Sequence, residues 1–246
     1  MADRILKDIR FYESDNENID GQSMPHELGK FFIPTMDTNY IGKRIARKLN
    51  ELQYAYGEFD HIYINLTTAI SENNLVVSNR NIDKRIKYLD FGINSEKVNS
   101  LSDNDKNSFI KATTFKLLRH ISIDKNLELI NKTETLISEF DTEIKIHFKI
   151  KETSSYKIDI YYQIASTNGG TQAIIEYKDK KANVCSFTNF KLQFYEDIYT
   201  LVDTINLSDD RIILKPKKSF TADIHNERYQ TPIELKLSEF EKFNCH

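Results

Sequence analysis

Three residues within the stretch IDIYYQIASTNGGTQAIIEYKDK, residues 158–180, have the types and the order needed for metal-dependent chemistry. Asp159 lies on one expected strand, and Glu176 and Lys178 lie on the next. Two carboxylates on adjacent strands can hold a divalent cation such as Mg²⁺, and a nearby lysine can steady an attacking water molecule or a developing phosphate charge. If the turn centres on Asn168-Gly169, all three side chains point to one face of the hairpin, with Lys178 nearly opposite Asp159.

This order of groups is similar to that of PD-(D/E)xK nucleases, but a simpler interpretation fits the same residues. In a sheet with one face in water, every second residue is polar, and Lys149 and Lys178 can flank Asp159 as cross-strand partners. Ile158, rather than the proline of the family's name, precedes Asp159. The formal net charge of −3 and the pI of about 6.1 also disfavour a protein that lives on nucleic acid, since phosphate contacts favour a basic excess. We favour a polar hairpin without a cofactor and keep the nuclease, using Asp159, Glu176, Lys178 and Mg²⁺, as the alternative.

The remaining reactive residues do not form a recognisable catalytic set. Asp90-Phe91-Gly92 matches a short kinase motif, but no glycine-rich loop or His-Arg-Asp loop accompanies it, so we interpret it as a strand end or a turn. The six histidines are dispersed, without the spacing of a helical zinc site. No signal-peptide core or membrane span is evident, which predicts a cytoplasmic protein. In that reducing compartment Cys185 and Cys245, the two cysteines, are expected to be free thiols.

Helical patterns dominate the first half of the chain. Apolar residues recur at helical spacing over 38–57 and over 125–140. Ser102 followed by Asp105 approximates a capping box and predicts the start of a further helix. One strand is expected within 59–67. The basic residues of the first helix are expected to form a solvated face; they are Lys43, Arg44, Arg47 and Lys48.

Strand patterns dominate the second half. Polar and apolar residues alternate without a fault over 143–151 and again over 156–165, and further strands are expected near 171–178 and 181–190. The sequence therefore predicts an α+β fold, with a mostly helical N-terminal half followed by an antiparallel β-meander. We expect a single compact domain, 1–246, with a possible subdivision into a helix-rich part, 1–141, and a β-rich part, 142–246.

The segment 59–118 contains a tyrosine-rich strand, FDHIYINLT, then the Asp-Phe-Gly turn, an Asn-x-Leu step and a capped helix. In this combination it resembles the immunity proteins encoded beside bacterial polymorphic toxins. The resemblance covers about a quarter of the chain. It implies a noncatalytic protein that binds one cognate protein toxin and blocks its site. From the charge and the hydropathy of the chain we expect no membrane contact and disfavour nucleic acid as a partner, and we expect no metal cofactor.

Two surfaces are candidates for binding such a partner. The acidic run ESDNENID, 13–20, is either a solvated loop or a surface that attracts a basic toxin. Tyr161 is expected on the polar face of its strand, and tyrosine offers a large contact area at low entropic cost. The predicted partner-binding residues are Glu13, Asp15, Glu17, Tyr161 and Glu176.

Overall fold

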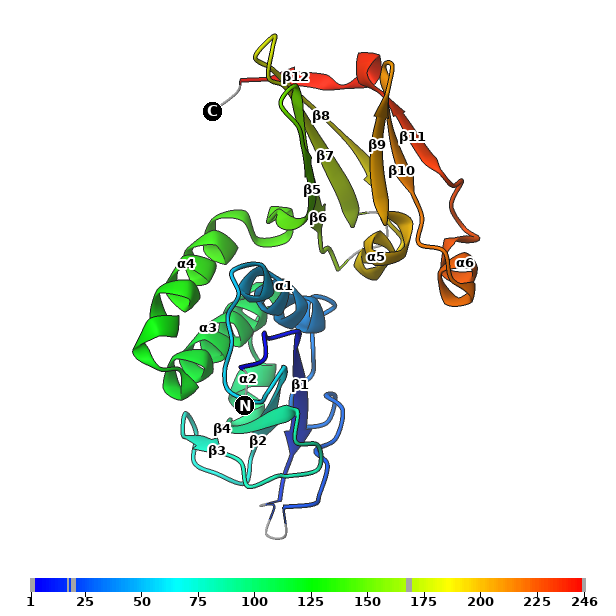
Figure 1. Cartoon of the computed structure of the whole chain (residues 1–246). Coiled ribbons are helices and arrows are strands. Elements are labelled where there is room, and N and C mark those ends of the chain that lie inside the picture. The colour runs from blue at the N-terminus through cyan, green and yellow to red at the C-terminus, as the bar shows by residue number, and fades with distance from the viewer. Residues whose placement is uncertain (1–2, 17, 19–20, 167–169, 245–246) are drawn as a thin grey trace. The chain divides into compact units, whose positions relative to one another are not determined.

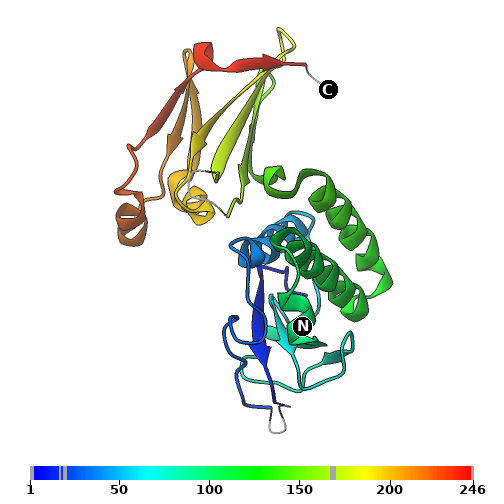
Figure 2. The ribbon, with the colours of Figure 1, turned by 180° about the vertical axis from the view of Figure 1, so that it is seen from behind.

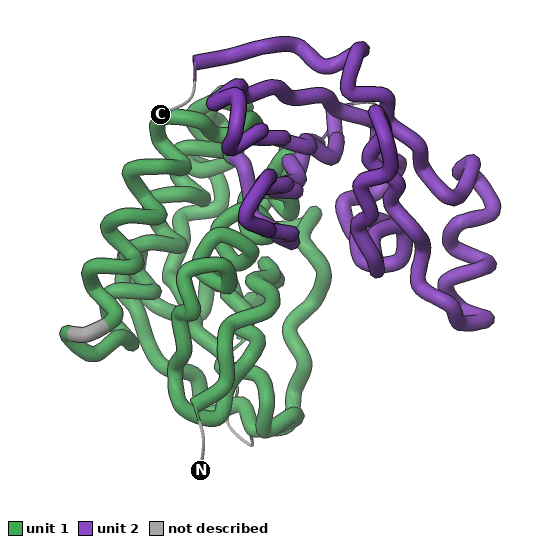
Figure 3. Tube along the Cα trace, turned by 45° about the horizontal axis from the view of Figure 1, so that its top comes forward, with its two compact units in different colours: residues 1–144 green, residues 145–246 purple. Residues whose placement is uncertain are grey.

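The computed structural model describes residues 3–16, 18, 21–166 and 170–244. The chain divides into two compact units, unit 1 (residues 1–144) and unit 2 (residues 145–246), coloured separately in Figure 3. Unit 1 contains, in chain order, β1 (Asp8–Ser14), α1 (Thr38–Glu51), β2 (His61–Thr67), β3 (Leu75–Val77), β4 (Ile86–Gly92), α2 (Ser95–Asn99), α3 (Asp103–Ile121), α4 (Asp124–Phe140) and the short 3-10 helix η1 (Asp141–Glu143).

Three of the four strands in the sheet of unit 1, β1, β2 and β4, run parallel to one another. The strand order is β1-β2-β4-β3, and β3 at one edge runs antiparallel to β4. A parallel pair needs a crossover connection, and α1 supplies it between β1 and β2. The apolar face of the sheet belongs to the same buried core as α1, α3 and α4, which pack against one another (Figure 1); its residues are Ile9, Phe11, Ile62, Ile64, Leu66, Leu89 and Phe91.

The predicted fold class is wrong, because the first half of the chain is not mostly helical. It carries four strands in a mixed sheet, and strands occur throughout the protein. The signal for β1 was hidden because Asp8, Arg10 and Glu13 interrupt its apolar residues. Asp90-Phe91-Gly92 forms the last three residues of β4. β1 and β4 each pair with β2 in parallel, over long distances in sequence, so neither β1 nor β4 carries the local turn signal of a hairpin.

The helices of unit 1 follow the predicted positions, with two differences. Ser102 caps α3 as expected, since its hydroxyl accepts a hydrogen bond from the Asp105 backbone N–H at 3.2 Å. However, α1 ends at Glu51, six residues before the predicted end at 57. The basic face of α1 is also not fully solvated, because Arg44 is completely buried and pairs with Asp37 and Asp141.

Unit 2 contains, among the described residues, the remaining strands and four short helices. In chain order these are β5 (Ile146–Glu152), β6 (Tyr156–Gln163), β7 (Gln172–Asp179), β8 (Val184–Lys191), η2 (Tyr195–Asp197), α5 (Ile198–Leu201), β9 (Thr204–Ser208), β10 (Arg211–Lys215), α6 (Phe220–Asn226), β11 (Ile233–Lys236), η3 (Leu237–Glu239) and β12 (Glu241–Phe243). Strands β5 to β8 form the antiparallel run expected from the alternation, and β12 joins it at β8.

Two antiparallel sheets make up unit 2. The five-stranded sheet has the order β12-β8-β7-β6-β5, and the three-stranded sheet has the order β11-β10-β9. They form two layers, which Figures 1 and 2 show from opposite sides. Lys151 on β5 connects the layers, because its Nζ donates to the backbone carbonyl of Ile205 on β9 at 2.6 Å; Lys149 Nζ donates to that of Val202, between α5 and β9, at 3.2 Å.

The expectation of a free thiol at Cys185 is wrong, because this residue is disulfide-bonded. Cys185 lies on β8, where its backbone is opposite Phe243 of β12 near the end of the chain. Cys245 lies outside the described residues. The disulfide bond of Cys185 was not predicted, because two cysteines far apart in a sequence give no signal that they pair.

Candidate functional site

The β6–β7 hairpin brings the two predicted carboxylates together. Asp159 is the direct cross-strand neighbour of Glu176, and Lys178 is opposite Lys157. Side chains alternate along a strand, so all four lie on the face opposite the buried Ile158. The predicted register, with Lys178 opposite Asp159, is therefore wrong by two residues. It assumed a turn at Asn168-Gly169, which lies outside the described residues.

Cations neutralise both carboxylates of this hairpin. Asp159, 8 % exposed, pairs with Lys157 Nζ at 2.8 Å and with His147 Nε2 at 3.4 Å. The hydrogen bond to Asp159 raises the pKa of Lys157. Glu176 pairs with Lys145 Nζ at 2.7 Å. The sequence predicted a lysine beside Asp159 but named Lys149, which lies opposite Ile160 and instead donates to the backbone carbonyl of Val202 at 3.2 Å.

Asp159 and Glu176 are the residues of this hairpin that would supply oxygen ligands to a Mg²⁺ ion. Lys178 would lie beside them on the same face. Across the described ranges, no group of three or more His, Cys, Asp or Glu side chains is arranged to hold a metal ion. As it stands, the arrangement forms two ion pairs, one within β6 between Lys157 and Asp159, and one between Lys145, which precedes β5, and Glu176 on β7.

Tyr161 lies next to this set on β6. Its ring meets the ring of His147 edge-on, with 5.3 Å between centroids, and Lys145 Nζ is 5.9 Å from its centroid. Tyr161 is half-buried. Tyr161 and Glu176 thus lie close together, because Lys145 contacts both of them.

The three acidic residues of the predicted N-terminal surface have different environments. Glu13 is 1 % exposed, and its carboxylate accepts hydrogen bonds from the backbone N–H groups of Lys30, Phe31 and Phe32 at 2.7–2.9 Å. Asp15 is exposed and pairs with Lys30 at 3.4 Å. Glu17 lies outside the described residues. The buried Glu13 carboxylate therefore fixes the backbone of residues 30–32 next to β1, whereas Asp15 lies at the surface.

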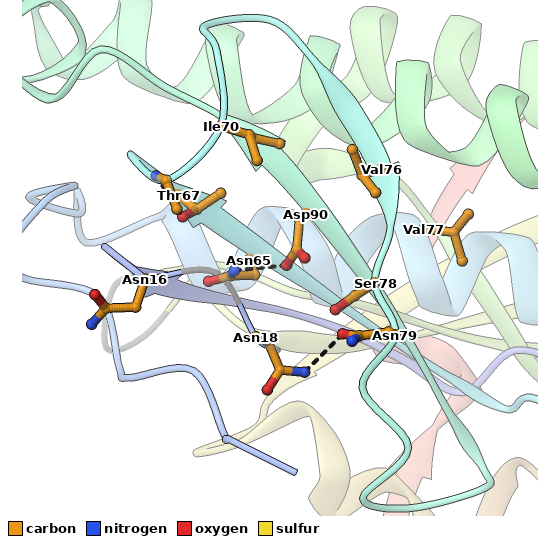
Figure 4. Close-up of a pocket in the computed structure, with 11 residues that line it drawn as sticks. Asn16, Asn18, Asn65, Thr67, Ile70, Val76, Val77, Ser78, Asn79 and Asp90 are labelled. Carbon is orange, nitrogen blue, oxygen red and sulfur yellow. Dashed lines mark hydrogen bonds between the residues drawn. The ribbon is translucent and has the colours of Figure 1, made fainter. Parts of the chain in front are cut away.

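A pocket that the sequence did not predict lies at the carboxyl ends of the parallel strands. Its volume is about 330 Å³, and Figure 4 shows the side chains around it; the lining residues are Asn16, Asn18, Asn65, Thr67, Ala69, Ile70, Val76, Val77, Ser78, Asn79 and Asp90. Ligands of open α/β sheets bind at this edge. The missed signal is the placement of Asn65 and Asp90 near the ends of two strands that pair in parallel.

A hydrogen-bond network forms the floor of this pocket. Asn65 Nδ2 donates to Asp90 Oδ1 at 2.7 Å and to Ser14 Oγ at 2.9 Å. Arg80 Nη1 also donates to Asp90 Oδ1, at 2.7 Å. The hydroxyl of Ser14 donates to Thr67 Oγ1 at 3.0 Å. These bonds tie the ends of β1, β2 and β4 together and fix the orientation of the Asn65 amide.

An exposed apolar surface lies on α6 in unit 2. Phe220 is 80 % exposed and Ile224 is 50 % exposed, and their spacing of four residues places them on one face of the helix. Phe194 is also 50 % exposed, and Arg228 Cζ lies 5.3 Å from its ring centroid. The exposure of these residues was not predicted, because an isolated phenylalanine gives no signal of exposure in the sequence.

No helix among the described residues is both long enough and apolar enough to cross a membrane. Comparison with known proteins adds no relative from which a function can be transferred. No family model matches the chain, and neither the curated proteins nor the solved structures contain a significant match.

Proposed function

We propose that this chain is a noncatalytic binding protein that neutralises a cognate toxin by forming a tight protein–protein complex. The observation that carries the proposal is the exposure of Phe220 and Ile224 on one face of α6. Contiguous apolar side chains at a surface are a mark of an interaction site, and aromatic residues dominate the binding energy of many interfaces. Phe194 is a further exposed aromatic residue of unit 2, and the Arg228 guanidinium lies over its ring; both residue types are enriched at hot spots.

The state of the candidate catalytic residues supports a noncatalytic role. Asp159 and Glu176 each have a cationic partner, so neither carboxylate is prepared for a cation from solution. Tyr161 and Glu176 remain candidates for a second part of the toxin-binding surface. Of the acidic run, Asp15 is the described residue that a basic toxin could reach, since Glu13 is buried.

The proposal is tested by co-expression with the product of the neighbouring reading frame, the candidate toxin. We expect the wild-type chain to protect the cells and to co-purify with the toxin. Replacing both Phe220 and Ile224 with serine is expected to weaken the complex at least about 100-fold, as the loss of two hot-spot side chains does. The matched control replaces the exposed apolar residues Ile33 and Ile123 of unit 1 with serine. A harmless neighbour with no complex, or equal affinity for both double variants, would contradict the proposal.

The cytoplasm is the compartment in which we propose that the protein acts. Fractionation of the cells is expected to recover the protein with the cytoplasmic proteins. Recovery of the protein from the periplasm or the medium, where a disulfide such as that of Cys185 persists, would contradict this proposal.

The alternative function, a Mg²⁺-dependent nuclease, is favoured by one observation. Asp159 and Glu176 lie directly opposite each other, with Lys178 on the same face. If these groups are catalytic, Asp159→Ala abolishes cleavage of DNA or RNA and leaves the fold intact. Absence of cleavage by the wild-type chain with Mg²⁺ and with Mn²⁺, over several substrates, would exclude this function.

A further inference from the structure

The pocket at the carboxyl ends of β1, β2 and β4 contains a buried acceptor without a donor. Asn65 is 1 % exposed, and its Nδ2 donates the hydrogen bonds to Ser14 and to Asp90. Its Oδ1 has no hydrogen-bond partner among the described residues. The amide cannot rotate to exchange the two atoms without placing an oxygen against the carboxylate of Asp90. Figure 4 shows Oδ1 on the side of Asn65 that faces away from Asp90.

The charge of the pocket is balanced. Asp90 is its charged lining residue, and Arg80, whose side chain is 3 % exposed, neutralises it at 2.7 Å. Among the eleven lining residues there is no lysine or arginine. A phosphate or carboxylate ligand would find no cation here, and a cationic ligand would compete with Arg80 for Asp90. The ligand that fits this balance is uncharged.

The walls of the pocket differ in polarity. Ile70 and Val76 provide aliphatic surface, and Val76 is 46 % exposed. Carboxamides line the pocket as well, on Asn16, Asn18 and Asn79. A carboxamide both donates and accepts, so it matches a ring edge that carries both kinds of group. Aliphatic side chains in turn match the face of such a ring.

We propose that this pocket binds an uncharged nucleobase or its nucleoside. The ring edge supplies an N–H or O–H donor to the Asn65 acceptor and exchanges hydrogen bonds with the surrounding carboxamides. The ring face packs against Ile70 and Val76. This site lies in unit 1, and the α6 surface of the toxin-binding proposal lies in unit 2, so either proposal can fail without the other.

The experiment is a titration of the full-length, ¹⁵N-labelled protein with adenosine, guanosine, cytidine and uridine, followed by NMR. At least one nucleoside is expected to produce saturable shifts of the backbone N–H signals of Ala69, Ile70 and Ser78, with a Kd below about 1 mM. Val76→Trp fills the pocket from an exposed position, and it is expected to weaken binding at least about tenfold. Ile70→Trp is the second blocking variant, in case the first does not fold.

Ile33→Trp adds the same ring at an exposed site of unit 1 outside the pocket, and it is expected to leave the Kd unchanged. The 5′-monophosphate of the bound nucleoside is expected to bind no more tightly than the nucleoside. The proposal is overturned if no nucleoside saturates, if both folded blocking variants bind as the wild type does, or if the monophosphate binds more than about tenfold more tightly.

Discussion

Asp159 on β6 lies directly opposite Glu176 on β7, and each carboxylate is held by a cation of its own. Two like charges at directly opposed positions destabilise an antiparallel pair. Lys157 and Lys145 offset that repulsion, each at less than 3 Å from its partner. The same two residues that suggest a metal site are thus members of two ion pairs, and mutation distinguishes the two roles.

Asp159→Asn is expected to lower the free energy of unfolding by about 1 kcal/mol, because it removes the ion pair with Lys157. Urea denaturation in metal-free buffer measures the change. Glu196→Gln, at an exposed position of the same unit, serves as the control and is expected to stay within about 0.5 kcal/mol of the wild type. A gain in stability for Asp159→Asn would indicate unrelieved repulsion, which is typical of an empty metal site.

Glu13→Gln is expected to lower the free energy of unfolding by about 2 kcal/mol, because a charged acceptor of three backbone N–H groups is replaced by a neutral one. Denaturation by urea also measures this change. Asp15→Asn is the matched control, since Asp15 is exposed and is expected to contribute less than about 0.5 kcal/mol. Equal effects of the two variants would contradict the structural role of Glu13.

The acidic run shows what the sequence could not reveal. Glu13 and Asp15 are two positions apart and both carry a carboxylate, yet the first is buried and the second is exposed. The strand β1 places Glu13 on the same face as Ile9 and Phe11, but it ends at Ser14, so Asp15 lies beyond it. Burial of Glu13 also requires the segment 30–32 to return to β1, and that contact lies beyond any local pattern.

Local signals were sufficient where structure is local. The Ser102 cap and the alternation along β5 to β8 were predicted, because helix ends and hairpins are specified by neighbouring residues. The parallel sheet and the Asn65 pocket were not, because β1, β2 and β4 are separated by long connections. The burial of Arg44 was not predicted either, because the spacing of the basic residues in α1 did not indicate it.

Asp37→Ala is expected to lower the free energy of unfolding by about 3 kcal/mol, because it leaves the buried Arg44 guanidinium without its main carboxylate partner. Asp141, 3.2 Å from Arg44, compensates in part, but its side chain is 44 % exposed. Chemical denaturation of Asp37→Ala, Arg44→Met and the double variant forms a complete cycle. The double variant is expected to recover most of the loss, and simple additivity of the two single variants would contradict the coupling.

Asp60 is expected to make stability depend on acid pH. Burial alone would raise the pKa of Asp60, but hydrogen bonds from Arg85, His61 and Lys7 outweigh it and hold the pKa far below its ordinary value. A lowered folded-state pKa means that the stabilisation is present above the unfolded value of about 4 and is lost as the pH falls below it. Unfolding measured from pH 6 to pH 2 is expected to show this loss, and Asp60→Asn is expected to reduce its slope. An unchanged slope would exclude Asp60 as its source.

Tyr63 is expected to make stability depend on alkaline pH in the opposite direction. Burial, with the neighbouring Tyr12 as a further cause, raises the pKa of Tyr63 to about 12. Tyr54 and Tyr229 also have a pKa of about 12, in both cases chiefly because of burial. A tyrosine with a raised folded-state pKa stabilises the fold below the unfolded value of about 10, and the stabilisation is lost as the pH rises from there toward 12. Urea denaturation between pH 9 and pH 11 measures the loss, which Tyr63→Phe is expected to reduce, because phenylalanine retains the packing but does not ionise. If Tyr63→Phe and the wild type lose stability in parallel, Tyr63 does not contribute to the alkaline transition.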